Sequence, residues 1–243
     1  MIRSKIKSLL RSLGFEVSTY CTENSKVCRL GTRLKVLGVD LVLDVGANVG
    51  QFAQELRHSG YQGRIISFEP LSSAYHDLLI NSKDDSMWQI APRCALGAFA
   101  EQSVINVSKN TWSSSILSIT ERHIQASPNA GLIGSEPVSI MTLDELALTK
   151  VYSARRPYLK IDTQGYERQV LDGAKKAIPH FAGIQLELSM AHLYEKQPDF
   201  IETIEWFEEM GFELFGLEPE FYDPETSRLL QVDAIFQRRH LND

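Results

Sequence analysis

The sequence predicts an α/β fold, in which a mostly parallel sheet has helices on both faces and an antiparallel hairpin at its C-terminal end. Three observations predict this class. Short apolar, β-branched runs alternate along the chain with longer segments of helical periodicity, as in a parallel sheet with helical crossovers. Several of the runs end in Gly, Asp or Glu, as strands do beside a binding crevice. Only a polar loop separates the last two runs, which predicts an antiparallel pair.

The regular part of the sheet is expected where apolar runs predict buried parallel strands, and helices are expected where apolar residues recur every three or four positions. The expected strands are residues 41–45, 64–68, 90–96, 158–162 and 183–188. The expected helices are residues 52–59, 72–82, 166–177 and 200–210. Gly60 and Gly211 directly follow two of these helices, where glycine commonly ends a helix.

The region after residue 96 is less regular. Residues 101–108 and 137–141 are expected to form added strands. Residues 109–136 are rich in Ser, Thr, Asn and Gly and are expected to form a long loop with one short helix, a length typical of binding loops. Thr142–Glu145 has the residue order of a capping box, which predicts a helix start. Residues 212–217 and 230–236 are expected to pair around a loop over residues 218–228.

The chain is expected to divide into an N-terminal helical extension, residues 1–38, and one main domain, residues 39–243. Residues 1–14 are basic and amphipathic, with apolar residues at helical spacing and Lys or Arg between them. Such a helix packs on its own domain or on a partner subunit, which we favour, or it lies on an anionic membrane surface. A short helix is expected near residues 33–37, and the oligomeric state is not predicted.

Composition limits the possible partners and location. The formal net charge is −6, from 25 basic and 31 acidic residues, so we expect no broad nucleic-acid surface. The three widely spaced cysteines suggest neither a disulfide scaffold nor a zinc site, and indicate free thiols. No apolar run is long enough to span a bilayer, and the N-terminus lacks the features of a signal peptide. We therefore expect a cytoplasmic protein, with the inner face of the membrane as an alternative location.

The strongest functional signal is the segment Asp44–Gly50, which follows the first strand as Asp-Val-Gly-Ala-Asn-Val-Gly. Gly46 and Gly50 allow a tight turn and close approach of a ligand, with Asp44 and Asn48 beside it. The spacing is neither that of a dinucleotide-binding loop nor that of a phosphate-binding Walker loop. Glu69 ends the second strand, where a carboxylate can accept hydrogen bonds from both ribose hydroxyls of an adenosine ligand.

Four segments together resemble the FkbM-type methyltransferases. These segments are Asp44–Gly50, Phe68–Pro70, Leu159–Glu167 and Val170–Ala174, and the resemblance covers roughly residues 39–238. It implies a Rossmann-like class I methyltransferase domain, S-adenosylmethionine as cofactor, and usually O-methylation of a hydroxyl on a sugar, glycan or other natural product. Family members often have Glu at the position of Gln164, so the role of this residue is open.

On this interpretation, methyl transfer is an in-line displacement that needs a positioned acceptor and a base. The catalytic candidates are Asp162, Glu187 and His192, at or just after strand ends. Asp162 and Glu187 are also the candidates for a divalent metal site, although the spacing of residues in the sequence does not require a metal there. The adenine is expected near Ala95 and Leu96, and Pro70 is a further candidate for cofactor binding. The substrate candidates are Lys160, Gln164 and, in the polar loop, Trp112 and Ser114.

Two other classes of function are open from sequence alone. An NAD-dependent oxidoreductase or epimerase would use a similar fold, although the glycine spacing opposes it. A non-catalytic protein that binds an adenosine ligand would keep the fold and lose the acidic strand ends. Asp44, Glu69 and Asp162 are all present, which favours an enzyme acting on a small-molecule or glycan acceptor.

Overall fold

The computed structural model describes residues 2–15, 17 and 20–239. A seven-stranded sheet forms the centre of the domain, with the strand order β3-β2-β1-β7-β8-β10-β9. Its strands are β1 Leu41–Val45, β2 Arg64–Phe68, β3 Trp88–Ile90, β7 Pro157–Ile161, β8 Gly183–Ser189, β9 Phe212–Tyr222 and β10 Leu229–Arg238. The pairs among the first five strands in this order are parallel, and β10 pairs antiparallel with both β8 and β9. The predicted fold class is therefore confirmed.

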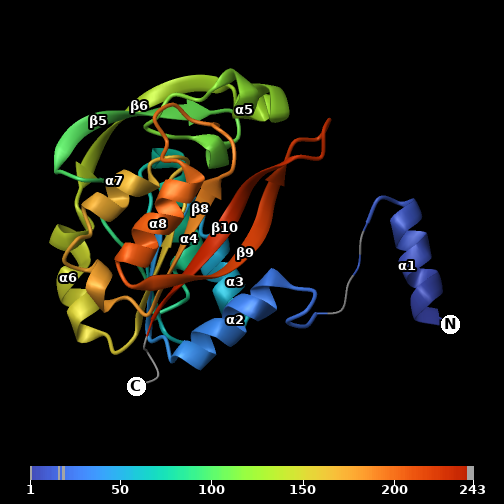
Figure 1. Cartoon of the computed structure of the whole chain (residues 1–243), viewed down its shortest axis with the longest axis horizontal. Coiled ribbons are helices and arrows are strands. Elements are labelled where there is room, and N and C mark those ends of the chain that lie inside the picture. The colour runs from blue at the N-terminus through green and yellow to red at the C-terminus, as the bar shows by residue number, and fades with distance from the viewer. Residues whose placement is uncertain (1, 16, 18–19, 240–243) are drawn as a thin grey trace.

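Helices cover both faces of this sheet (Figure 1). One face packs against α2 and α3 through a core that includes Leu34, Val42 and Tyr158. The other face packs against α6, α7 and α8 through a larger core that includes Leu43, Leu159 and Phe207. The helices are α2 Lys26–Leu37, α3 Gln51–His58, α4 Ser72–Ser82, α5 Glu121–Ala126, α6 Leu143–Ser153, α7 Glu167–Asp172 and α8 Phe200–Glu209, with short 3-10 turns at Thr111–Ser113, Pro128–Ala130 and Ile178–His180.

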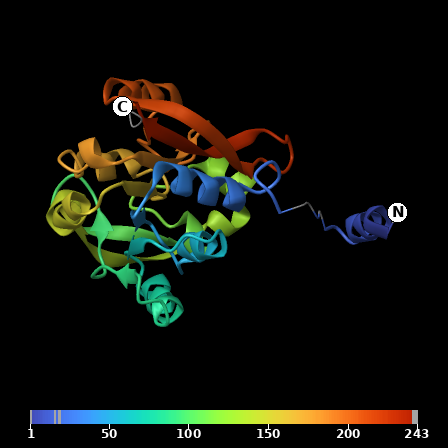
Figure 2. The same ribbon diagram turned by 90° about the horizontal axis from the view of Figure 1, so that it is seen from below.

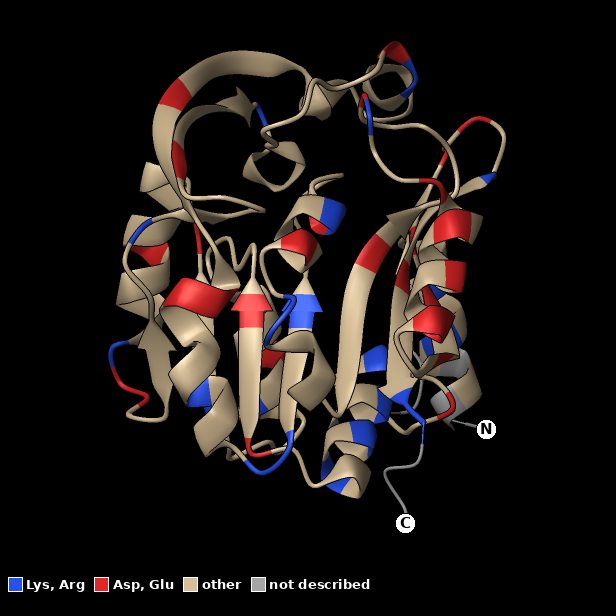
Figure 3. Cartoon of the chain, turned by 60° about the vertical axis from the view of Figure 1, so that its left-hand side comes forward, with Lys and Arg blue, Asp and Glu red and all other residues tan. Residues whose placement is uncertain are grey.

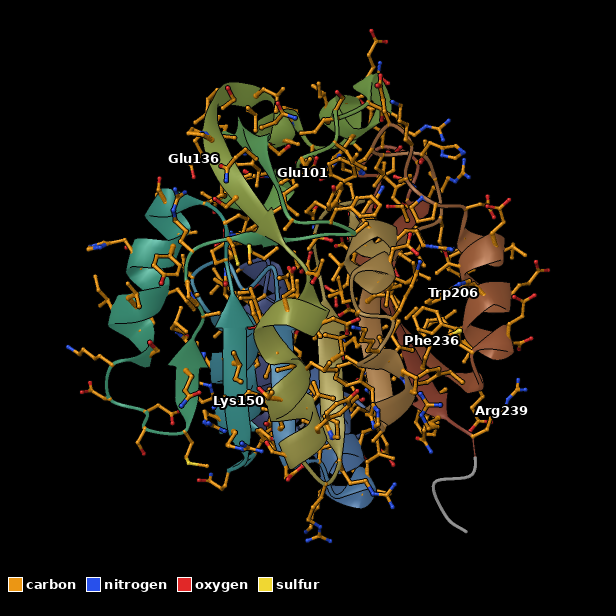
Figure 4. The ribbon with its side chains drawn as sticks, turned by 90° about the vertical axis from the view of Figure 1, so that its left-hand side faces the viewer. Glu101, Glu136, Lys150, Trp206, Phe236 and Arg239 are labelled. Atoms are coloured by element: carbon orange, nitrogen blue, oxygen red, sulfur yellow. The ribbon has the colours of Figure 1, made fainter. Side chains whose placement is uncertain are left out.

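A second, three-stranded sheet lies above the first and has the order β4-β6-β5 (Figure 1). Its strands are β4 Ala95–Leu96, β5 Glu101–Ser108 and β6 Leu132–Met141. Figure 4 labels Glu101 on β5 and Glu136 on β6, while Trp206 and Phe236 mark α8 and β10 of the main domain. The added strands predicted from sequence are thus present, but they form a sheet of their own. The second one begins at Leu132, so the predicted loop over residues 109–136 is shorter.

Three predicted elements are corrected. The strand expected over residues 90–96 is two strands in different sheets, because Pro92 lies between them and has no N–H for a strand ladder. The helix expected over residues 166–177 ends at Asp172, since a Cβ on Gly173 would lie 1.9 Å from the Gly97 carbonyl oxygen and the two segments must touch there. The hairpin strands extend to Tyr222 and Arg238, which shortens their loop.

The N-terminal extension contains two helices. The predicted basic helix is α1, Ile2–Ser12, which lies away from the rest of the chain in two perpendicular views (Figures 1 and 2). Ile6, Leu9 and Leu13 are exposed, so packing of this helix on its own domain is not found. The short helix expected near residues 33–37 is the full helix α2, whose Ser25 cap accepts a hydrogen bond from the Cys28 N–H and whose Leu30 and Leu34 are buried. The division at residue 38 stays a prediction.

Candidate functional site

A cavity of about 380 Å³ opens at the carboxyl ends of β1, β2, β7 and β8. In Figure 3, ribbon segments coloured for Asp and Glu or for Lys and Arg lie at the tips of central strands. We divide the cavity wall into two parts. The glycine-turn half comprises Gly46, Asn48, Glu69, Pro70, Ala95 and Leu96. The carboxylate half comprises Asp162, Gln164, Glu187, Glu218, Glu220 and Asp233.

The turn after β1 is closed by its backbone. Gly46 has φ +75°, and a Cβ built there would lie 1.8 Å from the carbonyl oxygen of Asp162. The N–H groups of Gly46 and Ala47 both donate to the Phe68 carbonyl at 3.0 Å, which fixes the turn to the end of β2. Glycine is therefore required at position 46 by conformation and by space.

Gly50 has a different role from the one predicted. It has φ +94° at the start of α3, and a Cβ there would meet Trp88 at 2.5 Å and Leu78 at 2.9 Å. It does not line the cavity. Gly50 thus lets α3 begin close to the neighbouring core and is not part of the cavity wall.

Glu69 connects the turn to the second strand. One of its carboxylate oxygens accepts from the Asn48 N–H at 2.7 Å, and the other accepts from the Leu71 N–H at 2.8 Å. Burial raises the pKa of Glu69 to about 7, although these two hydrogen bonds lower it. The carboxylate lines the cavity, as an acceptor for ribose hydroxyls would.

Asp44 lies beneath the turn and does not line the cavity. Its carboxylate accepts from the Ser67 hydroxyl at 3.0 Å, and this hydroxyl accepts from the Trp88 indole N–H at 2.9 Å. The other carboxylate oxygen lies 3.4 Å from Lys160 Nζ. Burial raises the pKa of Asp44. The position of Asp44 beneath the turn fits a role in supporting the turn.

Lys160 is a buried cation that contacts carboxylates and a backbone carbonyl of the protein itself. Its Nζ lies 3.3 Å from Asp162, 3.4 Å from Asp44 and 3.4 Å from the Gly46 carbonyl oxygen, and it sits over the Phe52 ring. Burial by itself lowers the pKa of Lys160, but the carboxylates of Asp162, Asp44 and Asp233 more than offset this and raise it. Lys160 therefore stays protonated, and it holds the turn, β1 and β7 together.

Gln164 connects the two candidate catalytic carboxylates. Its amide nitrogen donates to Asp162 at 2.8 Å and to Glu187 at 2.7 Å, while its amide oxygen accepts from the Tyr194 hydroxyl at 2.6 Å. Since carboxylates only accept, the nitrogen must face them. The Ser115 hydroxyl donates to the Gln164 carbonyl at 2.8 Å, which supports its left-handed backbone at φ +58°.

Asp162 and Glu187 are brought together as predicted, in different environments. The Asp162 side chain is 35% exposed and faces the cavity. Glu187 also accepts from the Gln231 amide at 2.8 Å. Burial raises the pKa of Glu187 well above its ordinary value, and the charges of Asp162, Glu167 and Asp233 add to the shift. Glu187 therefore holds a proton more readily than an ordinary glutamate.

The side chains around Asp162 and Glu187 do not fit the divalent metal site for which these two carboxylates were candidates. The amide N–H groups of Gln164 stand between the two carboxylates, where a cation would need oxygen ligands. Among the described residues, no group of three or more His, Cys, Asp or Glu side chains is arranged to hold a metal ion.

Most of the other predicted residues lie where expected. Pro70, Ala95 and Leu96 line the glycine-turn half, and Trp112 and Ser114 also line the cavity. Trp112 is 66% exposed, which places it at the rim.

His192, the third catalytic candidate, is not brought to the cavity with Asp162 and Glu187. It is exposed and is not among the residues that line the cavity. Its backbone carbonyl accepts from the Thr120 hydroxyl at 3.1 Å, so the segment supports the polar loop.

Sequence reasoning missed the wall formed by α2 and the hairpin. Lys26, Glu218, Glu220 and Asp233 line the cavity. Lys26 donates to Glu220 at 2.7 Å, and Arg29 pairs with both oxygens of Glu218. One available signal was Asp233 itself, a single carboxylate within the apolar run of residues 230–236.

Comparison with known families gives one match. The model described as the methyltransferase FkbM domain matches residues 44–214, more than half of the chain. A search of curated proteins finds no match to the sequence.

The chain is also similar to several solved structures. Magnesium protoporphyrin IX methyltransferase from Synechocystis PCC 6803 is 8% identical, with 97% of this chain and 96% of that chain covered and a TM-score of 0.47. Precorrin-6y C5,15-methyltransferase from Geobacter metallireducens GS-15 is 11% identical, with coverages of 93% and 94% and a TM-score of 0.44. TehB from Haemophilus influenzae is 10% identical, with coverages of 87% and 62% and a TM-score of 0.47.

Proposed function

The chain belongs to the FkbM methyltransferase family, and from this membership and the site geometry we propose that it transfers a methyl group from S-adenosylmethionine to a hydroxyl of a sugar, glycan or other natural product. The observation that supports this most is the joining of two features in one cavity. Glu69 and the Gly46 turn offer an adenosine site, and Asp162 lies at the end of the next strand but one from Glu69 in the sheet.

The cofactor fits the residues present. Glu69 is a buried carboxylate open to the cavity, suited to two ribose hydroxyls, and Pro70, Ala95 and Leu96 give an apolar wall for a base. The sulfonium of the bound cofactor supplies an activated methyl group, so the protein mainly has to position the acceptor.

Asp162 has the position of a general base. Its carboxylate is fixed on one oxygen by Gln164 and on the other by Lys160, and it faces the cavity. With the cofactor bound, Asp162 would accept the proton of the acceptor hydroxyl as that oxygen takes the methyl group. Lys160 keeps its proton and does not compete as a base.

The first test is of the cofactor site. Isothermal titration should show binding of S-adenosylmethionine, and Glu69→Ala should weaken it at least about tenfold, because the ribose loses two charge-assisted hydrogen bonds. Glu136→Ala, which removes a partly buried carboxylate outside the cavity, is the control and should bind normally. A nicotinamide cofactor that binds in place of S-adenosylmethionine would contradict the proposal.

The second test is of the chemistry. Cofactor consumption should be screened over sugar, lipid-linked glycan and polyketide hydroxyls. With the acceptor found, Asp162→Asn should keep cofactor affinity and lower turnover about 10²- to 10⁴-fold, as loss of a general base does. Full turnover in this variant would remove Asp162 from the catalytic role, and no turnover by the wild-type chain on any acceptor would favour a non-catalytic binding protein.

We also propose that α1 contacts an anionic membrane surface. The exposed Ile6 and Leu9 of α1, and the exposed Leu13 directly after it, are accompanied by Lys7 and Arg11, a composition suited to anionic lipid. No helix among the described residues has the length and apolarity needed to cross a bilayer. Sedimentation with phosphatidylserine vesicles should carry the protein down, and Leu9→Asp should release it. Equal sedimentation of the two chains would overturn this proposal.

A further inference from the structure

Three carboxylates lie side by side across the outer strands of the sheet. In the strand register, Asp233 on β10 is opposite Glu187 on β8 and also opposite Glu218 on β9. Side chains at opposite register positions share one face of a sheet and lie close together, and like charges there are destabilising. Such an arrangement is typical of a functional site, where a local rule of stability is broken.

The three carboxylates differ in what neutralises them. Glu218 is paired with Arg29 on α2, and Glu187 accepts hydrogen bonds from two neutral amides, those of Gln164 and Gln231. Within the part of the chain that the structure describes, the Asp233 side chain has neither a hydrogen bond nor an ion pair. It is surrounded by protein on its other sides and lines the cavity.

Two of the three cations in the cavity wall are paired with carboxylates: Lys26 pairs with Glu220, and Lys160 lies between Asp44 and Asp162. The third, Arg33, sits over the Phe215 ring, and within the described residues it has no ion pair. The wall around Asp233 therefore has surplus negative charge. Burial and the charges of Glu220 and Asp162 together raise the pKa of Asp233 to about 7, although Lys160 and Lys26 lower it. Asp233 and Asp162 line the same cavity.

We propose that the methyl acceptor carries a protonated amine, which binds at Asp233 while the neighbouring hydroxyl of the same molecule faces Asp162. This rests on the proposed function and names its substrate class: amino sugars or other amino alcohols. An ammonium group has three donors and a full positive charge, and it compensates a buried carboxylate far better than a neutral hydroxyl. A divalent cation fits less well, since the Gln164 and Gln231 amides direct N–H groups at Glu187.

The test uses matched sugars and the full chain saturated with S-adenosylhomocysteine. The probes are methyl glycosides with an amine at C2, C3 or C6, each with its hydroxyl counterpart and its N-acetyl derivative. At pH 7.5, titration calorimetry should show at least one amine that binds at least about tenfold tighter than its counterpart, with the gain lost on N-acetylation. In Asp233→Asn this ratio should fall to near one, while Asp172→Asn, which alters a surface ion pair, should retain it.

Three outcomes would overturn the amine proposal: no amine binds, the neutral counterparts bind as tightly, or the ratio survives in Asp233→Asn. Preferential binding of Mg²⁺ alone at this position would also overturn it. Titration with S-adenosylhomocysteine distinguishes a failure of the amine proposal from a failure of the proposed function. Normal affinity in Asp233→Asn shows that the variant is folded, and failure of the wild-type chain to bind it would contradict the methyltransferase site instead.

Discussion

The glycine-turn half and the carboxylate half of the cavity are built in different ways. The first is made by backbone: Gly46 and Ala47 donate to Phe68, and the Asn48 N–H donates to Glu69. The second is made by long polar side chains from distant segments, such as Gln164 on the turn after β7 and Gln231 on β10. One half is thus fixed by local conformation, and the other by hydrogen bonds and charge that only the assembled sheet provides.

The two halves also differ in electrostatic cost. The glycine-turn half has one cavity-lining carboxylate, Glu69, which accepts two backbone hydrogen bonds. The carboxylate half gathers five, and Asp233 among them has no partner within the described chain. We infer that the first half recognises an invariant ligand by shape and that the second selects the acceptor by charge. Variants in the first half should therefore lose cofactor binding, and variants in the second half should lose turnover or acceptor binding.

The largest effect is expected from Gly46→Ala in the glycine-turn half. The new Cβ would meet the Asp162 carbonyl oxygen in a backbone conformation that alanine rarely adopts. We expect a loss of about 3 kcal/mol or more of unfolding free energy and no measurable cofactor binding. Gly60→Ala is the matched control: φ is +92° with no atom within 4 Å, so the cost should be only about 1–2 kcal/mol. Similar losses in both variants would show that the close approach at Gly46 is unimportant.

Gln164→Glu in the carboxylate half should lower turnover and leave cofactor binding in the glycine-turn half unchanged. It keeps the size of the side chain but replaces a donor to Asp162 and Glu187 with a third carboxylate. Removal of a proton from the cluster becomes harder, so the acidic limb of the pH–rate profile should move to higher pH and turnover at pH 7 should fall roughly 10- to 100-fold. Cofactor affinity, measured by calorimetry, should stay within a few fold.

The control for Gln164→Glu is Gln197→Glu, at a buried glutamine outside the cavity that accepts from the Leu193 and Tyr194 N–H groups. It should lower stability without moving the pH–rate profile. An unchanged profile in Gln164→Glu would show that Gln164 does not position the base.

Asp233→Asn should stabilise the protein at alkaline pH. Asp233 has a pKa of about 7 in the folded chain and 3.8 as its ordinary value, so the folded state holds the extra proton between these values. Stability therefore falls as pH rises through this window, and the penalty is complete above pH 7. The variant should gain about 1 kcal/mol, or roughly 2–4 °C in Tm, at pH 8, with the gain shrinking toward pH 4.

Thermal melts of both chains at pH 5 and pH 8 measure this effect. Asp223→Asn is the opposite case, because backbone hydrogen bonds from Thr226 and Glu225 lower the pKa of Asp223. That variant should lose stability above pH 4. A Tm gain in Asp233→Asn that does not depend on pH would argue against a charge origin.

The smallest effect is expected from Arg29→Met, which breaks the pair that fixes α2 to β9. Arg29 holds both oxygens of Glu218 and two backbone carbonyls, but its side chain is 35% exposed and screened by water. We expect a loss of at most about 1 kcal/mol, smaller at high salt. Lys175→Met breaks an ion pair whose lysine side chain is 70% exposed. It should lower the unfolding free energy, measured by chemical denaturation, even less. A larger loss in Lys175→Met would contradict this ranking.

The sequence predicted the glycine-turn half almost completely because its parts are local. The Asp44–Gly50 turn and Glu69 follow strands that apolar runs identify, and parallel strands place their ends at one edge. It predicted less of the carboxylate half. Asp162 and Glu187 were found as strand ends, but Asp233 was missed, because its neighbours depend on β10 returning antiparallel beside β8. His192 lies outside the cavity that Glu187 lines, since nearness in sequence does not give nearness in space.

Some features were determined by the sequence alone: the α/β class, the positions of most main strands along the chain, the family and the glycine turn after the first strand. These rest on periodicity, glycine positions and residue order, all of which are local properties of the chain. Only the tertiary structure decided that Asp44 supports the turn from below, that Gln164 joins two carboxylates and that Asp233 faces the cavity without a partner. Burial and cross-strand register produce these roles, and both arise only when segments far apart in sequence pack together.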